Sequence, residues 1–238
     1  DAVNYYATFD NYKVGVLQGA FIEEHLQLEN DSTSPKNIEL FTGSIDDNNV
    51  NFIWSGAMFV LEPYLKSGKL ICLSAQTKKE QVETHRWLSE VAENRMTKLI
   101  GELNYGPDEG QTPLHAVLAP NDTVANGIMT ALTKAAHFKK DNFPIITGQD
   151  CTKPAVKSIK KGYQSMCVFK DSRILADHVA TMADAIFEKT EVPVNDTTTY
   201  NNGTGFIPTF LCSPTVVTNE NLHELLIDSG YYSPKDLR

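Results

Sequence analysis

The chain has 238 residues, of which 41% are apolar, and its 30 acidic and 21 basic side chains give a net charge of −9 at pH 7. The apolar content is sufficient for a hydrophobic core and excludes a disordered chain. The acidic balance argues against binding to nucleic acid or to an anionic membrane surface, because both need a basic face.

Short apolar runs alternate with longer helical patterns along most of the chain. Each run is nearly continuous in apolar character, as expected for a strand that is buried on both faces. The predicted strands are Tyr5–Phe9, Ile38–Thr42, Leu70–Ala75, His115–Ala119, Pro144–Thr147 and Ser165–Phe169. The predicted helices are Asn48–Lys66, Asp122–His137, Ala155–Lys161 and Arg173–Lys189. This alternation predicts an α/β fold, with a parallel β-sheet flanked by helices on both faces.

The C-terminal part of the chain has a different pattern. Asn195–Gly205 is polar and rich in Gly and Asn, which predicts a surface loop. Phe206–Val217 is extended, and its prolines predict a strand at a sheet edge. Asn219–Asp228 is predicted to form a last short helix. The cysteines form no CxxC pair and are interpreted as small buried thiols rather than as a zinc site or disulfide framework; they are Cys72, Cys151, Cys167 and Cys212.

Polar residues follow several of the predicted strands. Ligands of an open parallel sheet bind beyond the C-terminal ends of its strands. The segments at these ends are Gly43–Asn49, Pro120–Asp122, Gly148–Asp150 and Lys170–Asp171. A single Asp or Asn at such a position is also typical of a helix cap, and Asp122 or Asp171 alone is interpreted in that way. Polar side chains at four strand ends together favour a polar binding pocket.

The side chains at these strand ends suit a sugar ligand. A carboxylate accepts a hydrogen bond from a hydroxyl group, a carboxamide both donates and accepts, and a lysine donates. The C–H face of a sugar ring packs on an aromatic ring. Trp87 follows the polar run 78–86 and is either such an aromatic platform or a core anchor at the start of the next helix.

Enzyme signatures are absent from the sequence. It contains no G-x-S-x-G, G-x-x-x-x-G-K-[ST] or G-x-G-x-x-G motif, and the histidines form no H-E-x-x-H pair. Neither a cofactor nor a metal is predicted. Asp47 and Asp150 are candidates for the paired carboxylates of a glycosidase, but their spacing in the sequence does not establish that pairing.

A series of short motifs occurs along the whole chain in one order. They are Tyr6–Asn11, Lys13–Gly15, Gly43–Ser44 with Asp47–Asn49, Leu61–Tyr64, Ser67–Lys69, Asn121–Asp122, Gly148–Asp150, Phe169–Lys170, Val194–Thr197 and Asp228–Tyr232. In this order the motifs resemble those of the sugar-binding receptors of bacterial ABC importers, the type I periplasmic binding proteins. Within that family they are most similar to the subgroup of xylose-binding and multiple-monosaccharide-binding proteins.

The resemblance implies a clamp of two Rossmann-like lobes that close by a hinge around a monosaccharide of the xylose, glucose, galactose or arabinose class. The implied sugar contacts are Asp47, Asn49, Trp87, Asn121, Asp150 and Lys170. The implied partners are the membrane subunits of an ABC permease. A sugar sensor that signals to a chemoreceptor or sensor kinase is the alternative, and sugar-responsive repressors share the fold. The implied location is periplasmic or extracytoplasmic, either free or as a membrane-anchored lipoprotein.

The family pattern also predicts the domain organisation. Residues 11–168 and 205–217 would form the second, sugar-binding lobe. Residues 1–10 and 169–200 would form hinge strands and a remnant of the first lobe, and residues 218–238 a C-terminal tail. Because most of the first lobe would precede Asp1, we expect a truncated receptor with little or no sugar affinity by itself.

Overall fold

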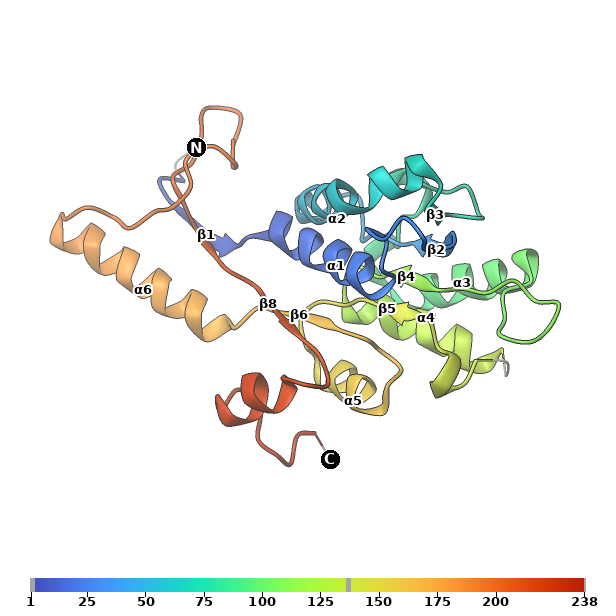
Figure 1. The fold of residues 1–238 in the computed structure, drawn as a ribbon. Coiled ribbons are helices and arrows are strands. Elements are labelled where there is room, and N and C mark those ends of the chain that lie inside the picture. The colour runs from blue at the N-terminus through green and yellow to red at the C-terminus, as the bar shows by residue number, and fades with distance from the viewer. Residues whose placement is uncertain (1–2, 136–137, 238) are drawn as a thin grey trace. The chain divides into compact units, whose positions relative to one another are not determined.

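The computed structural model describes residues 3–135 and 138–237. The chain forms two compact units. Unit 1 comprises Asp1–Asp10 and Lys170–Thr215, and unit 2 comprises Asn11–Phe169 and Val216–Arg238. Figure 1 shows the elements of both units along the colour gradient of the chain.

Unit 2 is built on a parallel sheet with the strand order β3-β2-β4-β5. The strands are β2 (Lys36–Leu40), β3 (Leu70–Ile71), β4 (Ala116–Leu118) and β5 (Ile145–Ile146). β6 (Cys167–Phe169) is hydrogen-bonded to β8 (Thr215–Val217), and a parallel bridge between Gln149 and Val168 connects β6 to the chain that follows β5. The predicted α/β class is therefore confirmed.

Helices cover both faces of this sheet. They are α1 (Asn11–His25), α2 (Asn48–Ser67), α3 (Ser89–Leu103), α4 (Asp122–Lys134) and α5 (Lys153–Lys161). Successive side chains of β4 point to opposite faces. Ala116 and Leu118 join the apolar cluster under α1 and α2. Val117 and Ala119 join the cluster under α3 and α4. Because the strands are buried on both faces, their sequences are nearly continuous runs of apolar residues.

The sequence patterns did not predict α1 or α3. α1 contains two glycines, which usually weaken a helix, but here glycines are the contact points between helices. A Cβ on Gly15 would lie 1.9 Å from the carbonyl oxygen of Ile53 in α2. A Cβ on Gly56 would lie 2.0 Å from the carbonyl oxygen of Tyr12. The two helices therefore pack backbone against backbone, a long-range contact that sequence periodicity cannot reveal.

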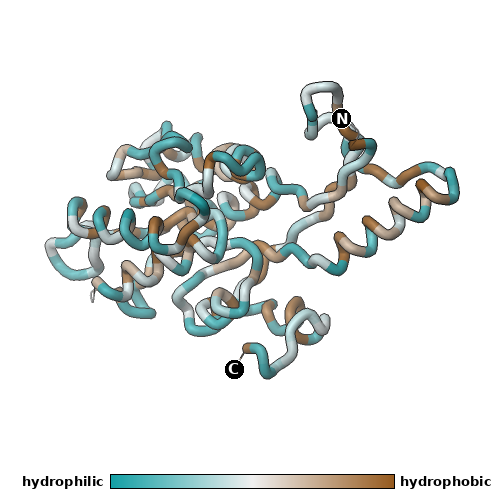
Figure 2. Tube along the Cα trace, turned by 180° about the vertical axis from the view of Figure 1, so that it is seen from behind, coloured by the Kyte–Doolittle hydropathy of each residue, from teal (hydrophilic) through white to brown (hydrophobic). Residues whose placement is uncertain are grey.

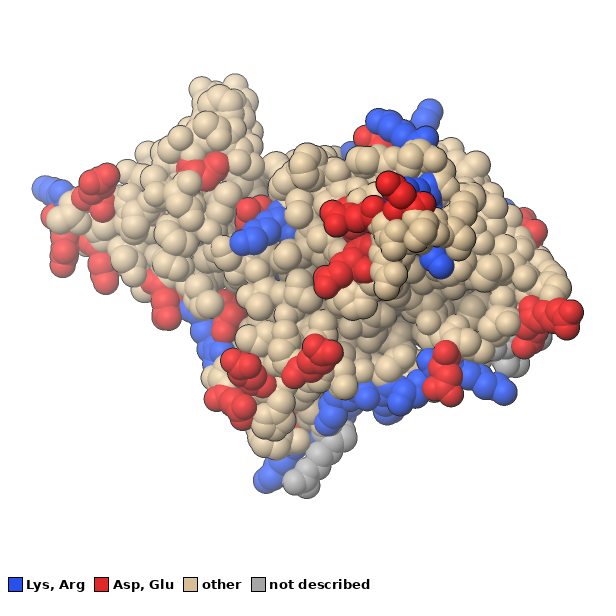
Figure 3. Space-filling view, viewed as in Figure 1, with Lys and Arg blue, Asp and Glu red and all other residues tan. Residues whose placement is uncertain are grey.

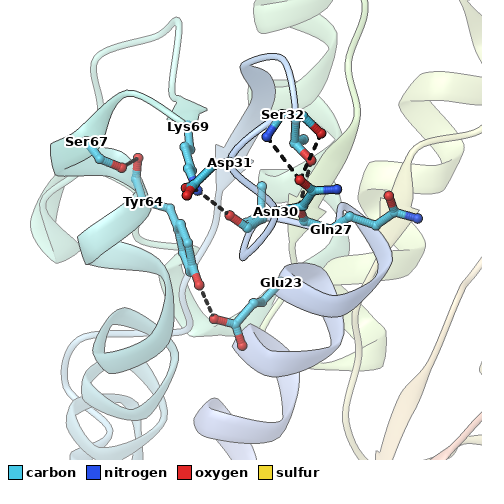
Figure 4. A network of polar contacts seen from close by, with 10 residues as sticks. Glu23, Gln27, Asn30, Asp31, Ser32, Tyr64, Ser67 and Lys69 are labelled. Carbon is cyan, nitrogen blue, oxygen red and sulfur yellow. Dashed lines mark hydrogen bonds and ion pairs between the residues drawn. The ribbon is translucent and has the colours of Figure 1, made fainter.

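A polar network ties together the chain near the ends of α1 and α2 (Figure 4). The Tyr64 hydroxyl donates to Glu23 Oε1 over 2.5 Å, and this bond raises the pKa of Tyr64 to about 12. Lys69 Nζ donates to Asp31 Oδ1 (2.9 Å) and to the carbonyl oxygen of Leu28 (3.0 Å). Lys69 directly precedes β3, so this network lies at the N-terminal edge of the sheet.

Most strands are shorter than their sequence patterns, whereas β2 has the predicted length but begins and ends two residues earlier than the predicted Ile38–Thr42. The run Leu70–Ala75 gives a strand only at Leu70–Ile71, because the chain turns and Ala75 adopts a φ of 56°.

Short 3₁₀ turns at Lys79–Gln81, His85–Trp87 and Lys140–Asn142 connect the larger elements. The predicted helix Asp122–His137 is helical over Asp122–Lys134, and its residues 136–137 lie outside the described residues.

Unit 1 has a small core. β1 (Tyr6–Phe9) pairs in parallel with β7 (Thr209–Cys212). α6 (Ser172–Glu188) packs on this pair. Met182, Ala185 and Val192 are its buried cluster among the described residues, with Ala7 and Phe210 packed against them. Apolar residues recur along α6 in Figure 2, and several are exposed; these are Ile174, Val179, Ile186 and Phe187.

The predicted domain boundaries differ from these units in the C-terminal part. Residues 205–215, expected in the sugar-binding lobe, belong to unit 1 because β7 pairs with β1. Residues 218–238 were expected to form a C-terminal tail, and the described part, 218–237, belongs to unit 2. Their turn of π-helix, His223–Asp228, contributes Leu226 to a cluster with Cys151 and Val156.

The face drawn in Figure 3 carries both acidic and basic side chains, with mainly acidic ones over α6. Among the described residues, no helix is long and apolar enough to cross a membrane. In the same part of the chain, no group of His, Cys, Asp or Glu side chains is arranged to hold a metal ion. The predicted burial of the thiols is confirmed for Cys151, Cys167 and Cys212, whereas Cys72 is half-buried.

Candidate functional site

The candidate site lies at the C-terminal edge of the unit 2 sheet. Asp47 and Asn49 follow β2, Asn121 follows β4, and Asp150 follows β5. These three strands are neighbours in the sheet and run parallel, so their C-terminal ends share one edge. All four side chains are half-buried. This is the edge at which open parallel sheets bind ligands.

α1 links the strand ends at this edge. The buried Gln18 donates from Nε2 to the carbonyl oxygens of Pro120 and Gly148, both at 3.1 Å. These two residues lie directly after β4 and in the chain that follows β5. Asn11, the first residue of α1, donates from Nδ2 to Asn49 Oδ1 over 3.0 Å. The same helix therefore fixes the backbone after two strands and the side chain of a candidate ligand residue.

The loop after β2 carries both a cap and a candidate contact. The Asp47 carboxylate accepts a hydrogen bond from the backbone N–H of Asn49 (2.9 Å) and caps α2. A carboxylate has further lone pairs, so this bond leaves acceptor capacity for a ligand hydroxyl. Asn49 uses its carbonyl oxygen for Asn11, and its NH₂ group is the donor of that side chain.

Trp87 is held above the loop that follows β2. A Cβ on Gly43 would lie 2.2 Å from Cη2 and Cζ2 of the Trp87 indole, so only glycine fits beneath the ring. A hydrogen bond holds the segment that carries Trp87 against this loop: the backbone N–H of Arg86 donates to Ser44 Oγ over 2.9 Å. The indole is half-buried and packs against apolar clusters of unit 2. Trp87 therefore anchors the chain before α3 and lies against the loop after β2. Its role as an aromatic platform for a ligand stays a prediction.

Two pairs of consecutive residues at this edge have left-handed backbones. Arg86 and Trp87 have φ values of 52° and 58°, and Asp150 and Cys151 have φ values of 96° and 49°. Such conformations cost a non-glycine residue on the order of 1–2 kcal/mol each. Each pair includes a candidate site residue. Strain of this kind concentrates where a side chain must be presented in a particular direction.

The structure corrects the assignment of caps. Asn121, predicted as a ligand contact, is the cap of α4, because its Oδ1 accepts from the backbone N–H of Val124 (3.0 Å). Asp122, interpreted as a cap, is instead a buried acceptor of side-chain and backbone bonds. Asp171 caps α6 as predicted, and its bond to Arg173 holds the pKa of this carboxyl below its usual range.

Lys170, the sixth predicted contact, belongs to unit 1. It is the residue after β6 and the first residue of the second segment of unit 1. The other five predicted contacts belong to unit 2, where one sheet edge carries Asp47, Asn49, Asn121 and Asp150, with Trp87 seated on the loop after β2. The carboxylates, carboxamides and half-buried indole at this edge can hydrogen-bond hydroxyl groups and pack against a C–H face.

Residues 1–191 match the family model described as a periplasmic binding protein domain. The chain belongs to this family. It is 44% identical over 232 residues to the multiple sugar-binding periplasmic protein SbpA of Azospirillum brasilense, covering 97% of this chain and 63% of that protein. It is 43% identical over 237 residues to the multiple sugar-binding periplasmic receptor ChvE of Rhizobium radiobacter, covering 99% of this chain and 65% of that protein.

A solved solute-binding protein has the same fold over the whole chain. This solute-binding protein of an ABC transporter from Clostridium phytofermentans, solved with bound β-D-glucose, superposes with a TM-score of 0.91 at 48% identity. The match covers 100% of this chain and 71% of that protein. The chain thus spans less than two thirds of the length of the two curated relatives named above.

Sequence reasoning missed several residues that shape this edge of the periplasmic binding protein domain. Gln18 and Asn11 were missed because α1 itself was not predicted. Arg86 was missed because no pattern marks a left-handed residue other than Gly or Asn. Asp122 was misassigned because a buried aspartate and a capping aspartate look alike in sequence. The Asn-Asp pair after β4 was the available signal, since only one of its members can be the cap.

Proposed function

We propose that this chain is the sugar-gripping part of a solute-binding protein that delivers a monosaccharide to an ABC importer in the periplasm or another extracytoplasmic space. The observation that carries the proposal is the arrangement at the C-terminal sheet edge. An indole is seated on Gly43 beside strand ends that carry two carboxylates and two carboxamides. The relatives named above, which are multiple sugar-binding periplasmic proteins, support the same ligand class.

Each side chain has a role that follows from its chemistry. Asp150 and Asp47 accept charge-assisted hydrogen bonds from sugar hydroxyl groups, and such bonds are stronger than neutral ones. Asn121 and Asn49 use their oxygen for a protein contact and offer an NH₂ group to a sugar oxygen. Trp87 packs against the C–H face of the ring. Lys170 stays a prediction from the family resemblance as a further donor.

The preference for binding over hydrolysis is also a proposal. One carboxylate oxygen of Asp47 accepts the hydrogen bond that caps α2. A carboxylate engaged in that way serves better as a fixed acceptor than as one member of an acid–base pair. In the complete natural protein, we therefore expect tight monosaccharide binding and no release of aryl from aryl glycosides.

Calorimetric titration of the complete natural protein with xylose, glucose, galactose and arabinose tests this proposal. We expect at least one aldose to bind, and we expect Asp150→Ala to weaken that binding about tenfold or more, because a charge-assisted bond is lost. Trp87→Ala should weaken it by a similar factor. Thermal midpoints should rise with the concentration of the bound sugar.

The chain offers matched controls for both substitutions. Asp141 is an exposed aspartate of unit 2, and Asp141→Ala should leave sugar binding unchanged. Trp54 in α2 packs on the apolar cluster of the other sheet face, so Trp54→Ala should lower stability without a specific loss of affinity. Binding of no aldose by a folded wild-type protein would overturn the proposed function. Equal losses in Trp54→Ala and Trp87→Ala would overturn the role of Trp87.

A further inference from the structure

Asp122 is a buried carboxylate next to the candidate site. It is 3% exposed and lies at the start of α4, directly after Asn121. Its Oδ2 accepts from the backbone N–H of Thr152 (2.7 Å) and from Thr152 Oγ1 (3.0 Å). Its Oδ1 accepts from Gln164 Nε2 and from the thiol of Cys167, both at 3.1 Å. Capping of α4 does not require it, because Asn121 already supplies the cap.

Asp122 contacts both ends of the loop that carries Asp150. At the start of the loop, the backbone N–H of Asp122 donates to the carbonyl oxygen of Gln149 over 3.0 Å. At its end, the Asp122 carboxylate accepts both hydrogen bonds of Thr152. Between these points lie Asp150 and Cys151, the consecutive residues with left-handed backbones. A strained backbone persists only where its surroundings over-determine it.

The other contacts of this loop are shared with β6. The backbone N–H of Asp150 donates to the carbonyl oxygen of Val168, and that of Cys151 donates to Cys167 Sγ, both over 2.9 Å. Cys167 in turn donates to Asp122, so the loop, β6 and α4 meet in one hydrogen-bonded cluster. This cluster closes around Gly148, where a Cβ would lie 2.5 Å from Asp122 Oδ1 and 2.2 Å from Gln164 Nε2.

The charge of Asp122 fits this role. Burial raises its pKa to about 6, and the hydrogen bonds from Cys167, Thr152 and Gln164 oppose that rise. At pH 7.5 the group is therefore mainly ionised and accepts from all four donors. Asp150 is the neighbouring carboxylate that adds to the rise in the pKa.

From this geometry we infer that Asp122 is a positioning residue: its carboxylate holds the 148–152 loop in the left-handed conformation that presents Asp150 to the ligand. The inference rests on the proposed sugar-binding function for its ligand. It assigns Asp122 no direct contact with sugar, because the side chain is buried. It predicts that sugar affinity depends on the Asp122–Thr152 contact as well as on the residues that touch the sugar.

Asp122→Asn in the complete natural protein tests the inference with two readouts. The new NH₂ group faces hydrogen-bond donors, so we expect the loop to open more often. Amide hydrogen exchange at residues 150–152 should become faster, while exchange at Asn49, on the loop after β2, stays unchanged. Affinity for the aldose that the wild-type protein binds should fall about tenfold at pH 7.5. Asp141→Asn, an exposed aspartate, is the matched control.

Thr152 provides a second pair of variants in case Asp122→Asn fails to fold. Thr152→Val removes only the hydroxyl bond to Asp122 and should weaken sugar binding about threefold. Thr152→Ser restores the hydroxyl and should restore the affinity to within about twofold. A purely steric role of the Thr152 side chain would give the opposite order, since Val matches the shape of Thr better than Ser does.

The outcomes separate this inference from the proposed function. Unchanged exchange at residues 150–152 in a folded Asp122→Asn variant would overturn the inference, whether or not any sugar binds. Unchanged affinity in that variant, with a sugar-binding wild type, would also overturn it. Faster loop exchange in a protein that binds no sugar would support the hold of Asp122 on the loop and would overturn the proposed function instead.

Discussion

The two units of the chain differ in how they are stabilised. Unit 2 has apolar clusters on both faces of its sheet, and strands such as β4 contribute to both. Unit 1 has a parallel strand pair, one helix and a buried cluster that, among the described residues, consists of Met182, Ala185 and Val192. Hydrophobic burial is the main stabilising term in folding. The cooperative stability of this chain should therefore reside in unit 2.

The two units also differ in how they accommodate charged side chains. Glu39 in β2 is fully buried, and its carboxylate accepts from the Tyr105 hydroxyl (2.7 Å) and from Ser74 Oγ (2.6 Å). Burial lowers the pKa of the half-buried Arg95 guanidinium, and the charge of the Glu39 carboxylate partly opposes that lowering. Unit 2 can bury such charges because its core surrounds them with partners. In unit 1, the charged residues of α6 lie at the surface.

The largest expected effect is the loss of Glu39. Glu39→Ala leaves the donors of Tyr105 and Ser74 without their acceptor, and we expect the free energy of unfolding to fall by about 3–5 kcal/mol. Both tryptophans, Trp54 and Trp87, belong to unit 2, so tryptophan fluorescence during denaturant unfolding reports on this unit.

Tyr105→Phe serves as the graded control for Glu39→Ala. It removes one hydrogen bond to the carboxylate and should cost about 1.5–3 kcal/mol. An unchanged fluorescence midpoint in Glu39→Ala would contradict the view that the buried carboxylate stabilises unit 2.

The second prediction concerns the contact between α1 and α2. Gly15→Ala places a methyl group against the carbonyl oxygen of Ile53, so the helices must separate, at a cost of about 1–3 kcal/mol. Gly101 in α3 is the matched control, because its added Cβ would meet nothing within 4 Å. Gly101→Ala should stabilise the protein by up to about 1 kcal/mol.

Thermal unfolding of these two glycine variants decides the point. Opposite signs of the midpoint shift are expected from the same chemical change. If both midpoints move upward, the close approach of α1 and α2 does not limit the stability of unit 2.

These residues also show how much the sequence could predict. The alternation of apolar runs and helical stripes predicted the α/β class, because strands buried on both faces differ visibly from amphipathic helices. The position of polar residues after β2, β4 and β5 followed from the parallel sheet. Neither inference needs information about which distant residues meet.

What the sequence could not predict depends on long-range contacts. In the sequence, the glycines of α1 suggest a flexible segment. Only the folded structure shows that they allow close contact with α2. Glu39 interrupts an apolar run, and its acceptor role depends on Tyr105 and Ser74, which come from other parts of the chain. The roles of Asp122 and Arg86 depend on the folded loops around them. These were the residues that sequence patterns misassigned or missed.

The smallest expected effect on stability, and the sharpest test of the contrast, is a change on the surface of unit 1. Phe187 at the end of α6 is 83% exposed, so Phe187→Ser should change the free energy of unfolding by no more than about 0.5 kcal/mol.

Other apolar residues of this helix are exposed as well, namely Ile174, Val179 and Ile186. Exposed apolar surface promotes association. We therefore expect the 238-residue chain to self-associate and Phe187→Ser to reduce that association, as measured by sedimentation velocity over a concentration series. Met182→Ala, in the buried cluster on the same helix, should instead lower the stability of unit 1 without reducing association. A chain that stays monomeric at high concentration would contradict the expectation that the exposed apolar side chains of α6 promote association.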